Sequence, residues 1–204
     1  MVRNTNGRSR TPRALRREKE IRREILRSAA AAFRKRGFAA TGMRDIALSA
    51  GLSPANLYYY FQSKQELLYF CQDHSLDLML AACREAGTRR ITAREKLARV
   101  VRAHLSATLD ELDGAAAHLE LDALPPALRR KIVAKRDRYE HSVRRLVERG
   151  VRTGQFAPCD ATLVTRAILG ALNWTARWYL PGGALSKDDL AESYARYLVR
   201  GLLP

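Results

Sequence analysis

The chain has 204 residues, of which 47% are hydrophobic, so it can bury a sizeable core and its composition is not that of a disordered protein. Its formal net charge is +16, and residues 1–64 hold 15 Lys and Arg against 4 Asp and Glu. An excess of positive charge in the first third of the chain predicts a polyanionic partner there, either nucleic acid or an anionic membrane surface.

The sequence contains no apolar run of membrane-spanning length, and residues 1–20 lack the apolar block of a signal peptide. We therefore expect a cytoplasmic protein that does not enter a membrane. Cys71, Cys83 and Cys159 form no C-x-x-C pair and are expected to be reduced. Cys71 and His74 stand three apart and could hold a metal, but a packed core pair is favoured. We expect neither a metal nor a cofactor.

Residues 1–17 are basic and polar and are expected to form a disordered arm. After them apolar residues recur at helical spacing, and no stretch alternates as a strand would. Ser63 with Glu66, and Thr92 with Glu95, have the spacing of capping boxes that begin helices. The sequence therefore predicts an all-α fold of about nine helices, near residues 18–37, 43–50, 54–60, 63–86, 92–111, 115–123, 127–152, 160–180 and 187–202.

Two of these helices, 43–50 and 54–60, have the pattern of a helix-turn-helix. Gly51 supplies the small residue that the turn needs, and Ser53 followed by Pro54 is typical of a helix N-terminus. In such a pair the second helix enters the DNA major groove. The apolar contact between the two helices is expected from Ile46, Ala47, Leu52, Leu57 and Phe61. The residues left facing outward on the second helix are Ala55, Asn56, Tyr58, Tyr59 and Tyr60.

The three consecutive tyrosines suit a DNA-contacting surface. A tyrosine hydroxyl can bond a phosphate oxygen, and its ring can pack on a sugar or on a thymine methyl group. Lys64 adds a positive charge beside a helix N-terminus, where free N–H groups attract phosphates. The alternative is that the tyrosines are partly buried aromatics of an ordinary helical hairpin; the basic arm nearby favours DNA.

Three motifs span residues 23–68: A-x-x-x-F-x-x-x-G-F, D-I-A-x-x-A-G-L-S and L-Y-Y-x-F-x-S-K-x-x-L. Together they resemble the DNA-binding domain of the tetracycline-repressor (TetR) family of bacterial regulators. One departure is Tyr60, which stands where histidine is common in that family. The resemblance implies a DNA-binding domain over residues 18–64 and a ligand-binding and dimerisation domain over residues 65–204. The DNA contacts that it implies are Met43 and Arg44 at the groove edge, Ala55, Asn56 and Tyr59 on bases, and Tyr58, Tyr60 and Lys64 on phosphates.

A homodimer on a roughly palindromic operator is expected, because a single helix-turn-helix reads too few bases for useful specificity. The resemblance implies that such a regulator usually acts as a repressor. We expect the interface on helices 160–180 and 187–202, with the alternative that their apolar stripes are intramolecular core. The first helix has two candidate stripes: Val164, Ile168, Leu172 and Tyr179, or Ala167, Gly170, Ala171 and Trp174. The second helix has Leu190, Tyr194, Tyr197, Leu198 and Gly201.

The segment AILGALNWTARWYLPGGALSKDDLAESYARYLVRGL, residues 167–202, resembles a TetR subgroup that includes sensors of acyl-coenzyme A thioesters. Arg166, Asn173 and Arg177 share one stripe of a helix, and Trp174 and Trp178 stand beside it. An apolar wall next to a cation and an amide suits an amphipathic anion. More positive charge comes from the preceding helix, with Arg129, Arg130, Lys131, Lys135, Arg136 and Arg138.

We therefore expect a small-molecule effector, an acyl-coenzyme A, between the long helices. Three alternatives stay open: a hydrophobic drug, another ligand without coenzyme A, or tryptophans that only pack in the core or dimer.

Two other classes of protein are disfavoured. The segment GLSPA, residues 51–55, lacks the preceding strand and the final glycine of a nucleophile elbow, so no enzyme is expected. A basic membrane-surface protein would place its arginines beside large apolar residues on one helix face. Here the arginines cluster with few such neighbours, at Arg13, Arg16, Arg17, Arg22 and Arg23.

Overall fold

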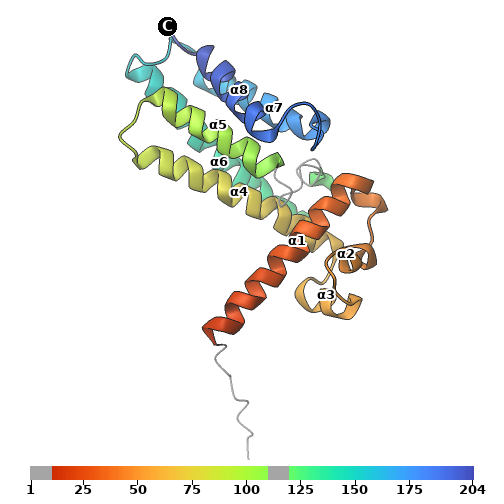
Figure 1. Ribbon diagram of the computed structural model, residues 1–204. Coiled ribbons are helices and arrows are strands. Elements are labelled where there is room, and N and C mark those ends of the chain that lie inside the picture. Colours follow the sequence, from red (N-terminus) through yellow and green to blue (C-terminus); the bar gives the residue numbers. More distant parts are fainter. Residues whose placement is uncertain (1–10, 110–119) are drawn as a thin grey trace, which may run out of the picture.

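A computed structural model describes residues 11–109 and 120–204. Over these residues the chain forms eight α-helices and one short 3-10 turn, with no strand, which confirms the all-α prediction (Figure 1). None of these helices is long and apolar enough to cross a membrane. The helices are α1 (Pro12–Ala40), α2 (Met43–Ser49), α3 (Pro54–Tyr60), α4 (Lys64–Thr88), α5 (Ala93–Leu109), α6 (Pro126–Arg152), α7 (Ala161–Trp178) and α8 (Lys187–Arg200), and the turn η2 (Leu121–Ala123) precedes α6.

Two expectations about the elements need correction. Because α1 begins at Pro12, residues 12–17 are helical and do not belong to a disordered arm. They consist mostly of strong helix formers, and proline is tolerated in the first turn. The helix expected at 115–123 falls largely on residues 110–119, outside the described chain; of the rest, Leu121–Ala123 form only the 3-10 turn.

The first three helices and the start of α4 form a small unit around its own apolar core, which corresponds to the expected DNA-binding domain. Phe33, Ile46, Leu57 and Phe61 are almost completely buried there. α2 and α3 lie beside the C-terminal half of α1, and the N-terminal half of α1 projects away from the body (Figure 1). The helix bends at Gly37, whose φ of 77° favours glycine.

The remaining helices form the larger unit, with α5 at its centre. α5 packs against α4, α6, α7 and α8, and most of its residues are buried. α4 belongs to both units, since its first turns pack on α1 and its later turns pack on α5 and α6. Lys135 of α6 is 7% exposed and forms ion pairs with Asp73 (2.5 Å) and Asp77 (2.8 Å) of α4. A buried ion pair is costly to break, so it holds α6 in register against α4.

The end of α6 yields a prediction about packing. A Cβ atom at Gly150 would lie 2.1 Å from Cδ2 of the buried Phe156, whereas a Cβ at Gly87, also in a helix, meets nothing within 4 Å. Gly150→Ala should therefore lower the free energy of unfolding by about 1–3 kcal/mol through overpacking. Gly87→Ala, the matched control, should be neutral or raise it by up to about 1 kcal/mol. Urea denaturation of both variants would check this; equal effects would contradict it.

Candidate nucleic-acid interface and effector cavity

The connection between α2 and α3 has the geometry of a helix-turn-helix. Gly51 has a φ of 65°, which few other residues adopt, and reverses the chain. Ser53 Oγ accepts a hydrogen bond from the backbone N–H of Asn56 at 3.2 Å and so caps α3. At the start of α2, the Asp45 carboxylate accepts from the Gly42 N–H at 2.9 Å and pairs with Arg36 of α1 at 3.4 Å. These contacts set the angle at which α3 is presented.

Only Leu57 of α3 is buried, so the helix offers its other faces to the outside. Ala55 and Asn56 are exposed, and Tyr58 and Tyr59 are 45% and 66% exposed. Tyr60 differs, because it is half-buried against the core and meets the ring of Tyr59 edge-on at 5.1 Å between centroids. Two of the three tyrosines are thus open to a ligand.

The residues expected at the groove edge lie on α2, next to this surface. Arg44 is exposed, whereas Met43 is half-buried and packs on the core. The exposed side chain on α2 that the sequence reading missed is Leu48, 83% exposed. It follows the buried pair Ile46 and Ala47, and an outward leucine at that helical position is visible from periodicity alone.

Lys64 has a structural role that its sequence position did not indicate. Its ammonium donates to the backbone oxygens of Phe38 (2.7 Å) and Ala39 (3.2 Å), at the end of α1, and lies 4.4 Å from the centroid of the Phe38 ring. Carbonyl groups at a helix C-terminus have no partner within the helix, so Lys64 satisfies two of them. An ammonium has three donors, which leaves one for a phosphate.

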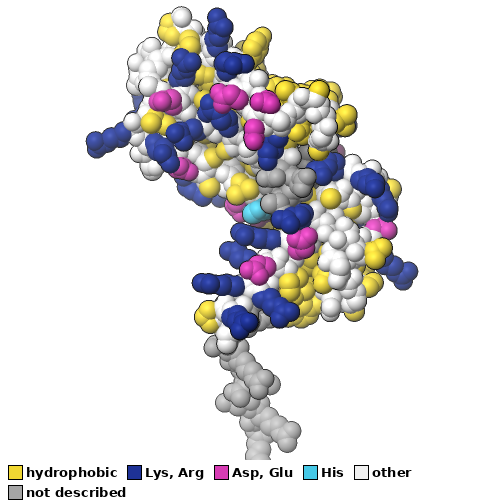
Figure 2. Space-filling model, viewed as in Figure 1, with side chains coloured by type: hydrophobic (Ala, Val, Ile, Leu, Met, Phe, Trp, Pro, Cys, Tyr) yellow, Lys and Arg dark blue, Asp and Glu magenta, His cyan; other side chains and the backbone are white. Residues whose placement is uncertain are grey.

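Positive charge continues from this unit along α1. Figure 2 shows Lys and Arg side chains gathered along the half of α1 that projects from the body. Arg13, Arg16 and Arg17 are exposed there. Helical geometry therefore holds part of the expected basic arm as a rigid extension of the DNA-binding unit.

The apolar stripes on α7 and α8 divide between core and surface. Ile168, Leu172 and Leu190 are 4%, 1% and 2% exposed, so this part of the expected interface is intramolecular core. Trp174 and Tyr197 are 63% and 81% exposed. A groove of about 460 Å³ lies between the two helices, lined by Ala171, Ser193, Tyr194, Arg196, Tyr197, Leu198 and Arg200.

The five residues expected to bind the effector separate into two places. Arg166, Trp174, Arg177 and Trp178 are exposed on the outer side of α7, where the Arg177 guanidinium lies 5.9 Å from the Trp174 ring centroid. Asn173 is exposed as well, but it lines a cavity between the helices of the larger unit. The structure therefore joins Arg177 with Trp174 but does not bring all five residues into one site.

That cavity has a volume of about 410 Å³, within the range of small-molecule sites, and was not found from the sequence. His104 of α5 and Tyr139 of α6 are buried in its wall, with Nδ1 of His104 3.1 Å from the Tyr139 hydroxyl oxygen. The signal in the sequence was a lone histidine on the apolar face of α5. The other lining residues are Leu76, Met79, Leu121, Arg136, Asp137, Glu140, Leu169 and Asn173.

Several of the basic residues of α6 are already engaged. Lys135 pairs with two aspartates of α4, Arg129 pairs with Asp122 at 3.0 Å, and Arg136 donates to Gln72 Oε1 at 3.1 Å. Fewer charges than the sequence suggested are thus available for a phosphate-rich ligand.

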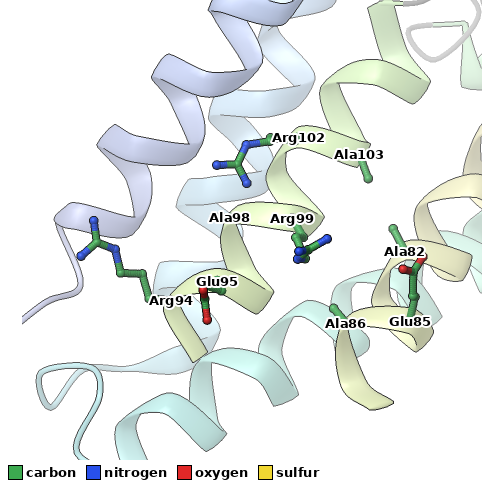
Figure 3. A pocket seen from close by; sticks show the side chains of 9 residues that line it. All are labelled: Ala82, Glu85, Ala86, Arg94, Glu95, Ala98, Arg99, Arg102 and Ala103. Atoms are coloured by element: carbon green, nitrogen blue, oxygen red, sulfur yellow. The ribbon is translucent and has the colours of Figure 1, made fainter. Parts of the chain in front are cut away.

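A wider groove of about 590 Å³ between α4 and α5 has an alanine-lined floor (Figure 3). Three of its five charged groups are engaged: Arg102 bonds Glu192 of α8 at 2.6 Å, Glu95 accepts from the Thr92 N–H at 2.9 Å, and Glu85 pairs with Arg89. The cavity at His104 adds the larger apolar residues Leu76, Met79 and Leu169 and is the better candidate for an apolar ligand group.

A capped helix-turn-helix with an outward α3, joined through α4 to a helical unit that holds a cavity, defines a ligand-sensing DNA-binding regulator. The family comparisons agree. Residues 25–69 match the model of the bacterial regulatory proteins of the tetR family, and residues 90–202 match a tetracyclin repressor-like C-terminal domain. The chain belongs to the TetR family, whose members are DNA-binding regulators and not enzymes.

Named relatives cover nearly the whole chain. The HTH-type transcriptional repressor KstR2 of Mycobacterium tuberculosis H37Rv is 29% identical over 185 residues, 89% of this chain and 92% of the relative. The fatty acid metabolism regulator protein of Bacillus subtilis is 24% identical over 182 residues, 88% of this chain and 94% of the relative.

Solved structures share the fold. The TetR-family regulator PfmR of Thermus thermophilus superposes with a TM-score of 0.78 at 35% identity, covering 88% of this chain and 99% of that one. AibR in complex with isovaleryl coenzyme A and operator DNA gives a TM-score of 0.73 at 24% identity, covering 90% and 98%; that likeness shows the fold alone.

The two contacts of Lys64 predict two separable effects. Lys64→Ala should lower the free energy of unfolding by about 1 kcal/mol, because two carbonyl groups of α1 lose a charged donor. If its third donor holds a phosphate, binding to every duplex should weaken and the salt dependence should flatten by about one unit. Urea denaturation and salt titrations would measure both. Lys35→Ala, which removes an exposed lysine of α1, is the stability control; an equal loss there would contradict the capping role.

Asn56 and Tyr59 should behave differently from Lys64. If they read base edges, Asn56→Ala or Tyr59→Ala should cost roughly 1–3 kcal/mol on the cognate site and little on random DNA. Equal losses on both duplexes in a fluorescence anisotropy assay would show that these residues do not read bases.

Proposed function

We propose that this protein is a homodimeric transcriptional repressor that binds a palindromic operator and leaves it when an amphipathic effector, an acyl-coenzyme A, binds. The observation that carries the proposal is the presentation of α3 by a capped turn, with Asn56, Tyr58 and Tyr59 outward. The name of the KstR2 relative supports repression as the mode of control.

Direct DNA contacts fit this helix. Asn56 lies near the N-terminus of α3, where recognition helices carry their base contacts, and an asparagine amide can bond adenine in two places. The exposed hydroxyls of Tyr58 and Tyr59 are suited to phosphates or base edges. Tyr60 is suited less to bases than to one flanking phosphate, because its ring is half-buried.

A dimer through α7 and α8 would cover the exposed apolar groups of that face. Tyr197 is 81% exposed and Trp174 63%, which is unusual for large aromatic residues of a monomer. Small residues at Ala167, Gly170 and Ala171 allow another helix to approach closely. Four helices, two from each protomer, would then form a bundle whose two-fold axis relates the two α3 helices.

The effector would use the cavity for its apolar part and the exposed residues of α7 for its charged part. Trp174 and Trp178, one turn apart and exposed on the proposed dimer face, offer aromatic rings for stacking. Arg177 beside Trp174 offers a positive charge for the head group. A phosphate-bearing head group and a hydrocarbon tail fit this division of polarity. An uncharged hydrophobic drug is the second candidate, favoured by the apolar residues Leu76, Met79 and Leu169 of the cavity.

The proposed dimer face predicts the effect of a charge at Tyr197. Tyr197→Glu should weaken the dimer roughly 30-fold or more in sedimentation at micromolar concentration, the effect expected of a central interface aromatic. Leu78→Glu, which places the same charge at a 43% exposed leucine of α4, should leave the dimer intact. A monomeric native protein would refute the homodimer.

A DNA-release assay tests the effector. Acyl-coenzyme A thioesters of increasing chain length and their free acids should be compared on the protein–operator complex. Thioesters should release DNA, and Arg177→Ala should raise the concentration needed about tenfold or more by removing a charged contact. Release by a free acid or a neutral hydrophobe, with no thioester acting, would refute coenzyme A and leave the repressor standing.

A further inference from the structure

One polar atom in the wall of the cavity has hydrogen-bonding capacity that the described part of the chain does not use. His104 is 2% exposed and its Nδ1 contacts the Tyr139 hydroxyl, but among residues 11–109 and 120–204 its Nε2 has no partner with hydrogen-bond geometry. Buried polar groups almost always have partners, because an unpaired one costs folding free energy. An unpaired atom on a cavity wall is therefore a candidate contact for a ligand.

The protonation state of the ring follows from its surroundings. Burial lowers the pKa of His104 to about 4, although hydrogen bonding to the nearby Asn173 side chain favours the charged form. This contact does not have the geometry of a hydrogen bond to Nε2. The imidazole is thus neutral at pH 7 and carries one N–H. Burial also raises the pKa of Tyr139 well above its usual value, so the phenol keeps its proton.

Counting hydrogens selects the tautomer. If Tyr139 donates to Nδ1, its proton is used and only the N–H at Nε2 is unpaired. If Nδ1 donates instead, both the Tyr139 proton and the Nε2 lone pair lack partners. The first arrangement leaves fewer unsatisfied groups, so the cavity presents an N–H donor.

A second donor lies close by. Gln72 of α4 is fully buried, its Oε1 accepts from Arg136 of the cavity wall at 3.1 Å, and its Nε2 has no partner within the described part of the chain. It stands one turn before Leu76, which lines the cavity. The apolar part of the wall consists of Leu76, Met79, Leu121 and Leu169, and the other lining residues are polar: His104, Arg136, Asp137, Tyr139, Glu140 and Asn173. The His104 donor therefore lies in a wall that is partly apolar and partly polar.

We propose that the cavity binds an apolar group carrying an acceptor oxygen, such as a ketone, which receives a hydrogen bond from Nε2–H of His104. The inference rests on the proposed function in that the group would be the buried part of the effector. A plain hydrocarbon would fill the same volume but leave the donor unpaired. The ligand class is thus oxygenated hydrocarbon and not simple alkyl chain.

Two probes of nearly equal shape test this: cyclohexanone and methylenecyclohexane, which differ by an oxygen in place of a methylene group. Each is titrated into the full-length protein without DNA, followed by ¹⁵N spectra of the histidine side chains. The measured quantity is the ratio of the two affinities. Burial costs the ketone more hydration than the hydrocarbon, so the ratio is compared between the native protein and its variants, in which this cost is the same. In the native protein, only cyclohexanone should shift the His104 Nε2–H resonance as a new hydrogen bond would.

The variants make the ratio interpretable. His104→Leu should lower the preference for the ketone about tenfold, and Tyr139→Phe should lower it as well, because the ring loses the hydroxyl that fixes its tautomer. His104→Gln, which keeps a donor, should retain most of the preference. Leu163→Ala, which changes a 67% exposed residue of α7 outside the cavity lining, should leave it unchanged.

An unchanged ratio in both His104→Leu and Tyr139→Phe, or no binding of either probe to the native protein, would overturn the inference. DNA is absent from this titration, so such a result would leave the repressor proposal intact. Conversely, a failed DNA-release assay would leave the affinity ratio measurable.

Discussion

Helix α4 is the constraint on which the rest of the molecule depends, because it belongs to both units. Its first residue, Lys64, binds the end of α1, and Leu67 and Leu68 are fully buried in the DNA-binding core. Further along, Asp73 and Asp77 hold the buried Lys135 of α6. A change in the position of α4 relative to α6 must therefore move the DNA-binding unit as well, since the first residue and the middle of the helix are both held by charged contacts.

The cavity lies against the same helix. Leu76 and Met79 line it, about 18 and 22 Å along the axis from Lys64 at 1.5 Å per residue. Arg136 is both a wall residue and the donor to Gln72 of α4. A ligand that displaces this guanidinium would act on α4 through one hydrogen bond, without a change in the core of the DNA-binding unit. That contact is a physical link between cavity and α4, and spatial position alone does not establish coupling.

The helices could be predicted from the sequence because each buries one stripe, and buried residues such as Ile132, Tyr139 and Val143 recur at helical spacing. The start of α1, residues 12–17, could not be predicted in this way. Its high charge density indicated disorder, although its residues have a high intrinsic preference for a helix. On α7 the sequence offered two candidate interface stripes, and only the packing shows that Ile168 and Leu172 are buried within the same chain. The DNA contacts were readable because they lie within one short segment, and they stay predictions.

The cavity could not be read from the sequence, because its wall is assembled from α4, α5, α6 and α7. His104 and Tyr139 are 35 residues apart, and no local pattern joins them. Only the oddity of a histidine among Val101 and Leu105 on a buried face was visible in advance. Its partner, and the nitrogen left without one, required the three-dimensional arrangement.

Energetics limit what a ligand in this cavity must do. A repressor has a DNA-binding conformation and a released conformation. To shift the population from almost entirely the first to almost entirely the second, an effector must bind the released conformation more tightly by about 5.5 kcal/mol. Pairing one buried N–H contributes only about 1–3 kcal/mol, and only if the bond forms in one state. A single hydrogen bond at His104 is therefore too weak to cause release. It can discriminate between ligands, but it cannot by itself shift the protein from one conformation to the other. In a dimer two cavities act on one pair of α3 helices, so each needs to supply about half of the difference. Displacement of Arg136 from Gln72 of α4 and contacts at Trp174 and Arg177, on the proposed dimer face, would have to provide the rest.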